Sequence, residues 1–409
     1  MKKYALVIIA LSLAGAALSG ILVADHYHPG IQERVIACGD AIDNPCRALG
    51  LSGYAEILGV PIALLGLFYY LFMLFTLLAA DYAGGRYYGD TVCVLLPLAL
   101  LALAADAVLA VILVRLDLFC TLCVSTYAVN LLVTVMLYLW WREMGRGEGH
   151  GMREAYRKLV GLPSTNDGRA VFSLFILFTF LLFFAVFTAG GLMKSNVRDG
   201  RLPEREIAEH VNAFYSPPPE TATLPESSLV LGTGELTISV FTDFLCGACY
   251  RFYQVEKDLF ARYRGRIRVA YYHYPLDRAC NPNVGTGRYP GSCAAARAMI
   301  ATSEMGIFRE YFLAHFGNFE RLKHDFSPDT AIATAAGLAD IERFTATMGS
   351  QKTGERLARD LEVARRFGIR ATPTIFIGGR RLEGVPPAEI LFGIIDRELR
   401  AGAASNARR

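Results

Sequence analysis

Charged residues are scarce in this chain of 409 residues. Asp, Glu, Lys and Arg together make up 19% of it, and the formal net charge is only +3. A chain so close to neutrality gives no indication of nucleic acid as a partner. Hydrophobic residues reach 53% and the mean hydropathy is +0.33, so the chain is too apolar for an ordinary soluble protein and long enough for two domains.

Five stretches without charge, or nearly so, are long enough to cross a bilayer, which takes about 20 apolar residues. They are Tyr4–Ala24, Leu58–Ala80, Val92–Val114, Phe119–Trp141 and Val171–Met193. Asp106 is the only charged residue inside any of them. A cleavable signal peptide is the alternative for the first stretch, because Lys2 and Lys3 precede a short apolar core. In either case the segment that begins at residue 25, directly after this stretch, lies outside.

The basic residues between the spans predict the orientation. With the N-terminus inside, nine basic residues lie in the inner segments and three in the outer loops. The inner ones are Lys2, Lys3, Arg86, Arg142, Arg146, Arg153, Arg157, Lys158 and Arg169, and the outer ones are Arg34, Arg47 and Arg115. Inner loops of membrane proteins carry the excess of Lys and Arg. We therefore expect a multi-pass protein of the cell (inner) membrane whose C-terminal part is periplasmic.

The nine cysteines sort by compartment on this topology. Eight lie outside, in the pairs Cys38/Cys46, Cys120/Cys123, Cys246/Cys249 and Cys280/Cys293, and only Cys93 lies at an inner membrane edge, without a partner. Disulfides form in oxidising compartments and not in the cytoplasm. The pairs outside are therefore candidates for redox or structural disulfides.

The segment "FTDFLCGACYRFY" places Cys246 just after a predicted strand and at the start of the helix Gly247–Arg262. Free N–H groups and the helix dipole at this position favour a thiolate, which lowers the pKa of Cys246. Cys249, one turn inside the helix, can resolve a mixed disulfide formed at Cys246. A zinc site with Cys280 and Cys293 is the alternative, but twelve residues separate that second pair, so we predict no metal.

Downstream, "ATPTIFIGG" puts Pro373 directly before an apolar strand. A cis Thr372–Pro373 bond is one interpretation, and an ordinary trans proline that opens a strand is the other. Between the CxxC motif and Pro373, the pattern predicts a second strand, "RIRVAYYHY", and then a mainly helical region from Ala294 to Phe367. A closing helix, Pro387–Ala401, is predicted after Pro373.

This arrangement resembles a thioredoxin fold, and specifically the DsbA-like thiol oxidoreductases with a helical insertion, over about residues 236–402. The resemblance implies that the loop with Thr372 and Pro373 packs beside the dithiol and helps to bind substrate. Gly-Ala stands between Cys246 and Cys249 here, in place of the Pro-His of the strongest oxidants. Cys280 and Cys293 flank a loop rich in Gly and Pro, for which a structural disulfide is favoured over a redox relay.

The membrane half carries a second resemblance. "CGDAIDNPCRALGLSGYAEILGVPIALLG" and "CTLCVSTYAVN" are similar to the vitamin K epoxide reductase family over about Tyr4–Trp141. The match includes Ser52 six residues after Cys46, a Gly-x-Pro before the next span, and Thr-Tyr-Ala after the CxxC motif. The family implies a four-helix bundle in which the CxxC motif lies against a quinone pocket. Its bacterial members are similar in carrying a fused thioredoxin-like domain after a fifth span.

The resemblance also implies roles for the membrane cysteines. Cys123 faces the quinone, Cys120 exchanges with Cys46, and Cys38 receives the attack from the soluble domain at Cys246. Static disulfides without redox function are the alternative for Cys38/Cys46 and for Cys120/Cys123.

Ser52 and Tyr127 stand where the family has residues near the quinone. The alternative is that their hydroxyl groups only form hydrogen bonds to the backbone of a neighbouring helix. The resemblance assigns no role to Asp106. An intramembrane carboxylate is a candidate functional residue, and a hydrogen bond to a neighbouring helix is its plainer interpretation.

Taken together, the sequence predicts a multi-domain chain: a four-helix transmembrane domain similar to vitamin K epoxide reductase (1–145), an inner loop with a fifth transmembrane helix (146–193), a linker (194–235) and a thioredoxin-fold domain (236–402). The proline-rich part of the linker, about Tyr215–Leu231, is expected to be a flexible coil.

The predicted function is that of a membrane oxidoreductase that forms disulfide bonds in reduced secreted or periplasmic proteins and passes the electrons to ubiquinone or menaquinone. Two alternatives remain. A reductive or isomerising relay would need a donor dithiol on the inner side, which Cys93 alone does not supply. A non-catalytic membrane receptor or transporter with structural disulfides would not need a CxxC motif at a helix start.

Overall fold

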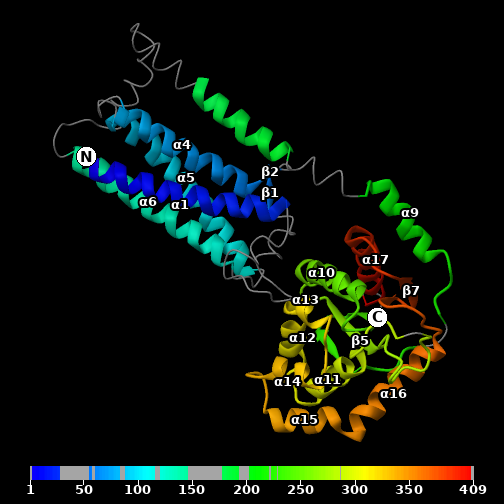
Figure 1. Cartoon of the computed structure of the whole chain (residues 1–409). Coiled ribbons are helices and arrows are strands. Elements are labelled where there is room, and N and C mark those ends of the chain that lie inside the picture. The colour runs from blue at the N-terminus through cyan, green and yellow to red at the C-terminus, as the bar shows by residue number, and fades with distance from the viewer. Residues whose placement is uncertain are drawn as a thin grey trace. The chain divides into compact units, whose positions relative to one another are not determined.

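The computed structural model describes residues 2–27, 55–57, 60–82, 88–115, 120–145, 177–192, 202–220, 223–227, 229–285 and 287–406. They fall into two compact units. One holds the described residues up to 192, and the other holds those from 202 onward (Figure 1).

Four long apolar helices build the N-terminal unit: α1 (Lys2–Tyr27), α4 (Ile62–Tyr82), α5 (Tyr88–Arg115) and α6 (Thr121–Gly145). Each is long and apolar enough to cross a membrane, which confirms four of the predicted spans. They run side by side as a bundle, with α1 packed on α4 and α6, and α5 packed on α6 (Figure 1). A short antiparallel pair, β1 (Glu56–Ile57) and β2 (Val60–Pro61), precedes α4.

Small residues let these helices approach closely. A Cβ added to Gly15 on α1 would lie 2.3 Å from the ring of Tyr70 on α4, so only glycine fits at this crossing. Close approach through small side chains is the usual way in which membrane helices associate. The centre of the bundle is filled by Ile8, Met73, Val92, Val133 and Trp140, all fully buried.

The predicted fifth span, Val171–Met193, is described only in its second part. The helix Leu177–Leu192 is apolar, but its described length is below that of a span. Phe178 stacks on Phe75 of α4, and a Cβ on Gly190 would meet Leu64 of the same helix. This helix therefore packs on α4, and its crossing of the membrane stays a prediction.

The C-terminal unit is built on a five-stranded sheet: β3 (Val230–Gly232), β4 (Leu236–Thr242), β5 (Ile267–His273), β6 (Thr374–Ile377) and β7 (Arg380–Glu383), in the order β3-β5-β4-β6-β7. β4 and β5 are parallel, and the other neighbours are antiparallel. Six helices lie between β5 and β6 in the chain: α11 (Ser292–Glu304), α12 (Phe308–Gly317), α13 (Phe319–Leu322), α14 (Pro328–Ala335), α15 (Ile341–Gly349) and α16 (Gln351–Arg366).

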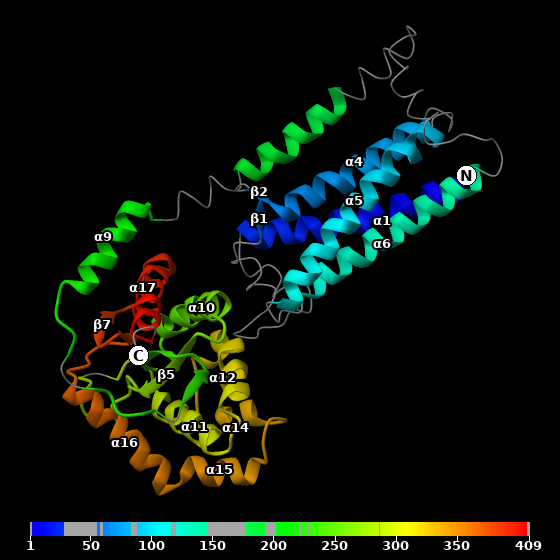
Figure 2. The ribbon, with the colours of Figure 1, turned by 180° about the vertical axis from the view of Figure 1, so that it is seen from behind.

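These elements confirm the predicted α/β domain with a helical insertion. Helix α10 (Gly247–Arg262) has the predicted bounds, and the closing helix α17 (Ala388–Asn406) begins one residue later than expected and extends further. α10 and α17 lie next to each other in both views (Figure 1, Figure 2). Strand β3 was not predicted, because three residues are too few for a pattern.

The residues that lead into the sheet are packed on this unit. Helix α9 (Glu204–Tyr215) lies against α17, where the Tyr215 hydroxyl donates a 2.7 Å hydrogen bond to Glu398. Further on, Glu220 forms an ion pair with Arg381 at 2.9 Å.

The prediction of a free coil over about Tyr215–Leu231 is therefore wrong for its described residues. Leu229 and Leu231 in this segment, and Phe214 just before it, are buried in the core of the unit and anchor it. The Ser227 hydroxyl also donates to the backbone oxygen of Tyr271 at 2.6 Å.

Candidate active sites

Cys246 caps the N-terminus of α10. Its backbone is extended (φ −75°, ψ 124°), and its carbonyl accepts the first bond of the helix from the Tyr250 N–H. The pKa of Cys246 lies well below its ordinary value, first because the Cys249 thiol donates a hydrogen bond to its sulfur, and then because Thr372 and the N–H groups of the first turn add to this effect against the cost of burial. The structure therefore bears out the predicted low pKa of Cys246.

Cys249 lies one turn further and is buried, and both cysteines are free thiols in this structure. Burial raises the pKa of Cys249, and the hydrogen bond and charge of Cys246 raise it further. The Asp243 N–H donates to the Cys249 sulfur at 3.5 Å. The two sulfurs therefore differ in character: Cys246 is the more acidic thiol and loses its proton first, whereas Cys249 keeps its proton.

The Thr372–Pro373 peptide bond is cis, as one of the two interpretations predicted. The Cys246 thiol donates to the Thr372 carbonyl oxygen at 3.7 Å, so the loop lies directly beside the reactive sulfur. The Pro373 carbonyl accepts from the Gly384 N–H at 2.9 Å, which ties the loop to the end of β7. The structure thus brings together Cys246, Cys249, Thr372 and Pro373, from two distant parts of the sequence.

Cys280 and Cys293 form a disulfide with a Cα–Cα distance of 5.9 Å. The loop that they enclose carries Tyr289, which the sequence reasoning missed. Burial raises the pKa of Tyr289, and the charge of Cys246 and a hydrogen bond to its sulfur raise it further, so the phenol lies against the reactive thiol. No local pattern marks this tyrosine, because its position depends on the path of an irregular loop.

Asp243 fixes the framework around the dithiol and was also missed. Its buried carboxylate accepts hydrogen bonds from the N–H groups of Leu245 (2.8 Å) and Leu276 (2.7 Å) and from the Ser292 hydroxyl (2.9 Å). Burial raises the pKa of Asp243 to about 7. The Leu276 carbonyl in turn accepts from the backbone of the Tyr289 loop. One signal was available, since Asp243 stands three residues before Cys246 at the end of β4.

A second pair of cysteines lies in the N-terminal unit. Cys120 and Cys123 form a disulfide at the beginning of α6, with a Cα–Cα distance of 5.3 Å. The Cys123 N–H also donates to the Cys120 sulfur at 3.2 Å. Cys120 is 1% exposed and Cys123 7%, so water reaches neither sulfur freely.

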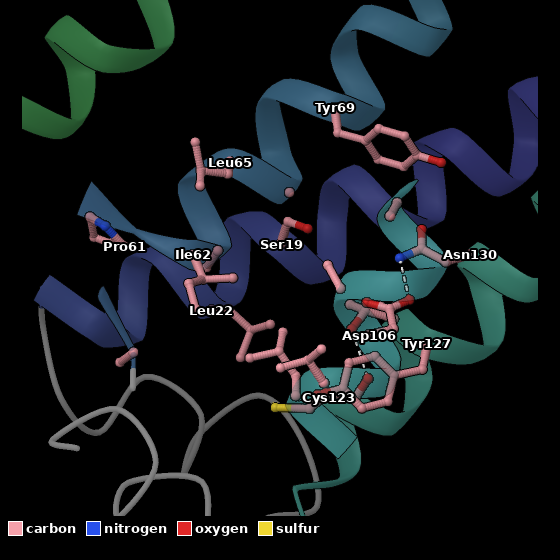
Figure 3. Close-up of a pocket in the computed structure, with 18 of the residues that line it drawn as sticks. Ser19, Leu22, Pro61, Ile62, Leu65, Tyr69, Asp106, Cys123, Tyr127 and Asn130 are labelled. Atoms are coloured by element: carbon pink, nitrogen blue, oxygen red, sulfur yellow. Dashed lines mark hydrogen bonds between the residues drawn. The ribbon is translucent and has the colours of Figure 1, made fainter. Parts of the chain in front are cut away.

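This disulfide borders a cavity of about 590 Å³ between α1, α4, α5 and α6 (Figure 3). The lining is mainly apolar and includes Leu22, Ile62, Leu98 and Leu109. Cavities of this size with few polar groups are typical sites for small organic ligands. Tyr127, expected near a quinone, lines the cavity one turn beyond Cys123.

A polar network lies deeper in the same cavity. Asn130 on α6 donates from Nδ2 to the Asp106 carboxylate on α5 at 2.7 Å (Figure 3). The Asn130 side-chain oxygen accepts from the Tyr70 hydroxyl on α4 at 2.6 Å. The expected bond of Asp106 to a neighbouring helix is therefore present, and the network joins three of the four helices.

Cys38, Cys46 and Ser52 lie outside the described residues, so their roles stay predictions. Cys93 on α5 is a half-buried free thiol. Across the part of the chain that the structure describes, no group of three or more His, Cys, Asp or Glu side chains could hold a metal ion.

Two family models match the chain. Residues 6–138 match the vitamin K epoxide reductase family, and residues 232–397 match a thioredoxin family. Both resemblances inferred from the motifs are thereby confirmed. The matches cover the helix bundle with Cys120 and Cys123 and the α/β fold with Cys246 and Cys249.

The chain is also similar to parts of larger curated proteins. It is 30% identical over 167 residues to the Na⁺/H⁺ antiporter NhaA of Herminiimonas arsenicoxydans, a match over 41% of this chain and 24% of that protein. It is 31% identical over 182 residues to Na⁺/H⁺ antiporter NhaA 1 of Mycolicibacterium gilvum, over 44% and 27%. The chain thus spans about a quarter of the length of these relatives.

Among solved structures, the chain is similar to oxidised BdbD from Bacillus subtilis, with 18% identity, a TM-score of 0.35 and coverage of 42% of this chain and 92% of that one. It is similar to a thioredoxin-like oxidoreductase from Silicibacter pomeroyi with 21% identity, a TM-score of 0.33 and coverage of 41% and 90%.

Proposed function

We propose that this chain is a membrane thiol–disulfide oxidoreductase, because a domain that matches the vitamin K epoxide reductase family precedes a thioredoxin-like domain. In this proposal it forms disulfide bonds in proteins outside the cytoplasm, with quinone as the electron acceptor. The observation that carries this proposal is the Cys120–Cys123 disulfide in the wall of an apolar cavity inside the helix bundle. A dithiol in this place can give its electrons to an acceptor dissolved in the bilayer.

The shape of the cavity supports a lipid-soluble ligand. Leu65 on α4 and Leu101 and Val108 on α5 all line it, and they are 38%, 67% and 61% exposed. The cavity therefore extends to the outer surface of the bundle between α4 and α5, where lipid would lie. A quinone ring can enter sideways from the bilayer, with its isoprenoid tail left among the lipid chains.

The asymmetry of Cys246 and Cys249 supports the proposed direction of electron flow. In the oxidised domain, a substrate thiolate attacks the Cys246 sulfur and Cys249 leaves. A second substrate thiolate then attacks the substrate sulfur and expels Cys246. Because hydrogen bonds stabilise the Cys246 thiolate, this second departure is favoured. Because the reduced form of this domain is stabilised, the Cys246–Cys249 disulfide readily accepts electrons and is a good oxidant of other proteins.

The substrate chain is expected to lie across Thr372 and Pro373. The Thr372 carbonyl is within reach of the Cys246 sulfur, so a peptide joined to that sulfur must pass beside it. We expect this loop to position the substrate cysteine for the attack that releases the product.

Electrons must then cross from one unit to the other, and the loop cysteines are the proposed carriers. Cys120 and Cys123 are too deeply buried for a folded domain to reach. We infer that Cys38 accepts electrons from Cys246 and that Cys46 passes them to Cys120. Each step is an attack of a thiolate on a disulfide through a mixed intermediate.

The orientation proposed from the basic residues places this chemistry on the periplasmic side of the inner membrane. Reduced periplasmic or secreted proteins are the proposed substrates, and ubiquinone or menaquinone is the proposed acceptor. Cys123, Tyr127 and Ser52 are the proposed quinone contacts.

Quinone reduction by the purified full chain tests the proposal. The protein in lipid nanodiscs is supplied with a reduced, unfolded protein and a quinone, and the absorbance of the quinone and the thiols left on the substrate are followed together. We expect one quinol for each disulfide formed. Cys123→Ala should abolish quinone reduction, whereas the matched control Cys93→Ala should leave it unchanged.

A reductive relay would give the opposite result. Added quinol would then reduce disulfides in an oxidised substrate, and no quinone would be consumed with reduced substrate. A structural role for the cysteines would give no redox turnover in either direction.

A further inference from the structure

Asp106 is the polar exception in one wall of the membrane cavity. The other lining residues that the structure describes on α5 are leucine, alanine, valine or isoleucine. A carboxyl group inside a membrane span is costly and is usually retained for a function. Packing of the bundle needs only apolar contacts at this position, so we look for a chemical role of the Asp106 carboxyl group.

The contacts of Asp106 hold it in one orientation and leave part of it available. Asn130 Nδ2 donates to Oδ2 of Asp106 at 2.7 Å, and Tyr70 fixes Asn130 from the other side at 2.6 Å. In the described part of the chain, Asp106 Oδ1 makes no hydrogen bond. The side chain is half-buried and lines the cavity, so a ligand there can reach it.

Asp106 and Cys123 line different parts of the same cavity. Asn130 lies seven residues after Cys123 on α6, which corresponds to about 10 Å of helix rise. Tyr127 lies between them, and Figure 3 shows Cys123 and Asn130 at opposite ends of this row of side chains. A ring with two carbonyl oxygens on opposite sides can therefore face the sulfur with one end and Asp106 with the other.

We propose that Asp106 is the acid that protonates the quinone oxygen remote from Cys123. This inference rests on the proposed quinone reduction and assigns a residue for which the family resemblance gives no role. The Asn130–Tyr70 pair would be its positioning system, because it holds one carboxyl oxygen and directs the other toward the cavity.

The atoms and electrons balance as follows. In the reduced protein, Cys123 reacts as a thiolate and Cys120 keeps its proton. Formation of the Cys120–Cys123 bond gives two electrons to the quinone. The Cys120 proton goes to the near oxygen and the Asp106 proton to the remote one, which completes the quinol. The Asp106 carboxylate then recovers a proton from water, which replaces the one that Cys123 released to water when it became a thiolate.

The other titratable groups around the cavity are less suited to this role. Tyr69, Tyr70 and Tyr127 are phenols, which are far weaker acids than a carboxyl group, and Tyr70 already donates to Asn130. Asp25 and His26 line the cavity near the end of α1, on the side where α6 begins, and so they lie at the dithiol end and not beyond it. Asp106 is thus the carboxyl group placed beyond the dithiol.

A single-turnover experiment tests this step. The full-length protein is reduced, freed of excess reductant and mixed with a short-chain quinone without oxygen, and quinol formation is followed. Asp106→Asn keeps the size of the side chain and removes the acid. We expect its rate to fall roughly a hundredfold, a typical loss for a general acid, while the quinone concentration for half-maximal rate changes little. Asp106→Glu should recover much of the rate.

Asp81→Asn is the matched control, because Asp81 is an exposed carboxyl group at the end of α4 and does not line the cavity. Asp106→Ala gives a second line of evidence, since added formic acid is small enough to enter the vacated space and should restore quinol formation. Either the loss in Asp106→Asn or this rescue supports the proposal if the Asp81 variant keeps the wild-type rate.

Three outcomes would overturn it. A wild-type rate in Asp106→Asn would remove Asp106 from the reaction while quinone reduction stands. A variant that needs far more quinone but reaches the wild-type rate at saturation would make Asp106 a binding group and not the acid. A reduced wild-type protein that forms no quinol would refute the proposed function and this step together.

Discussion

The Cys246 thiol lies 3.7 Å from the carbonyl oxygen of Thr372 and donates a hydrogen bond to it. The contact joins the beginning of α10 to the loop before β6, so two strand ends meet at the reactive sulfur. One side of this sulfur is thereby occupied by backbone, and Tyr289 lies against it as well. An incoming thiol must approach along the side that remains open.

The different roles of Cys246 and Cys249 can be tested by trapping. Cys249→Ala should accumulate mixed disulfides between Cys246 and periplasmic proteins, because the resolving thiol is missing. Non-reducing gels of cells that produce the variant would reveal them as adducts that disappear on reduction. Cys246→Ala is the matched control and should form none. Adducts that require Cys249 and not Cys246 would reverse the assignment of attacking and resolving thiols.

The pKa of Cys246 predicts its reactivity with pH. Since the donors around its sulfur lower this pKa, alkylation of the reduced protein by iodoacetamide should stay fast well below pH 8.5, the ordinary cysteine value. The rate should fall only when the pH drops through the lowered pKa and the thiolate takes up a proton. Mass spectrometry of the Cys246 peptide measures the rate at each pH.

Tyr289 should contribute to that lowered pKa. The charge of Cys246 raises the pKa of Tyr289, and the interaction is reciprocal, so the phenol stabilises the thiolate. Tyr289→Phe is therefore expected to move the alkylation midpoint of Cys246 to higher pH. Tyr311→Phe is a suitable control, because Tyr311 is buried elsewhere and bonds to the Ala331 carbonyl. An unchanged midpoint in Tyr289→Phe would mean that the phenol only fills space.

The Cys280–Cys293 disulfide is expected to stabilise the loop that carries Tyr289. A bridge over 13 residues should contribute about 3 kcal/mol to the free energy of unfolding in the chain-entropy model. Replacing both cysteines by Ala should lower the midpoint of thermal unfolding of the C-terminal unit, measured by hydrogen exchange in the full chain. Quinone reduction by the molecules that remain folded should continue. Lost turnover with unchanged unfolding would instead place this pair in the relay.

The order of the relay gives a prediction about the loop cysteines, which lie outside the described residues. A disulfide requires Cα atoms within about 7 Å, so a single loop cysteine cannot serve both Cys120 and Cys246 without moving. We expect Cys123→Ala to accumulate a Cys46–Cys120 bridge and Cys249→Ala a Cys38–Cys246 bridge. Digestion of alkylated protein and mass spectrometry identify the joined peptides. Dominant Cys38–Cys120 or Cys46–Cys246 bridges would refute this order and leave the oxidase function standing.

The sequence by itself determined the features that rest on local physics. Runs of about 20 residues without charge are long enough to cross the apolar core of a bilayer. Four of the five runs are helices long and apolar enough to span a membrane. The strand, the CxxC motif and the helix after it follow from the periodicity of apolar residues, and α10 has the bounds that this pattern predicted. The lowered pKa of Cys246 was predicted from its place at a helix N-terminus, although the hydrogen bond from the Cys249 thiol is the larger cause in the structure.

Only the tertiary structure decided which distant side chains meet. The rotation of α5 and α6 about their axes sets whether Asp106 reaches Asn130, and apolar runs do not encode that rotation when every face is apolar. The path of an irregular loop brings Tyr289 to Cys246, although no periodic pattern marks the residue. The proline-rich segment before β3 packs on the sheet because a few buried apolar residues anchor it, and composition alone predicted a free coil. Local patterns specify elements, and the contacts between them depend on how the whole chain packs.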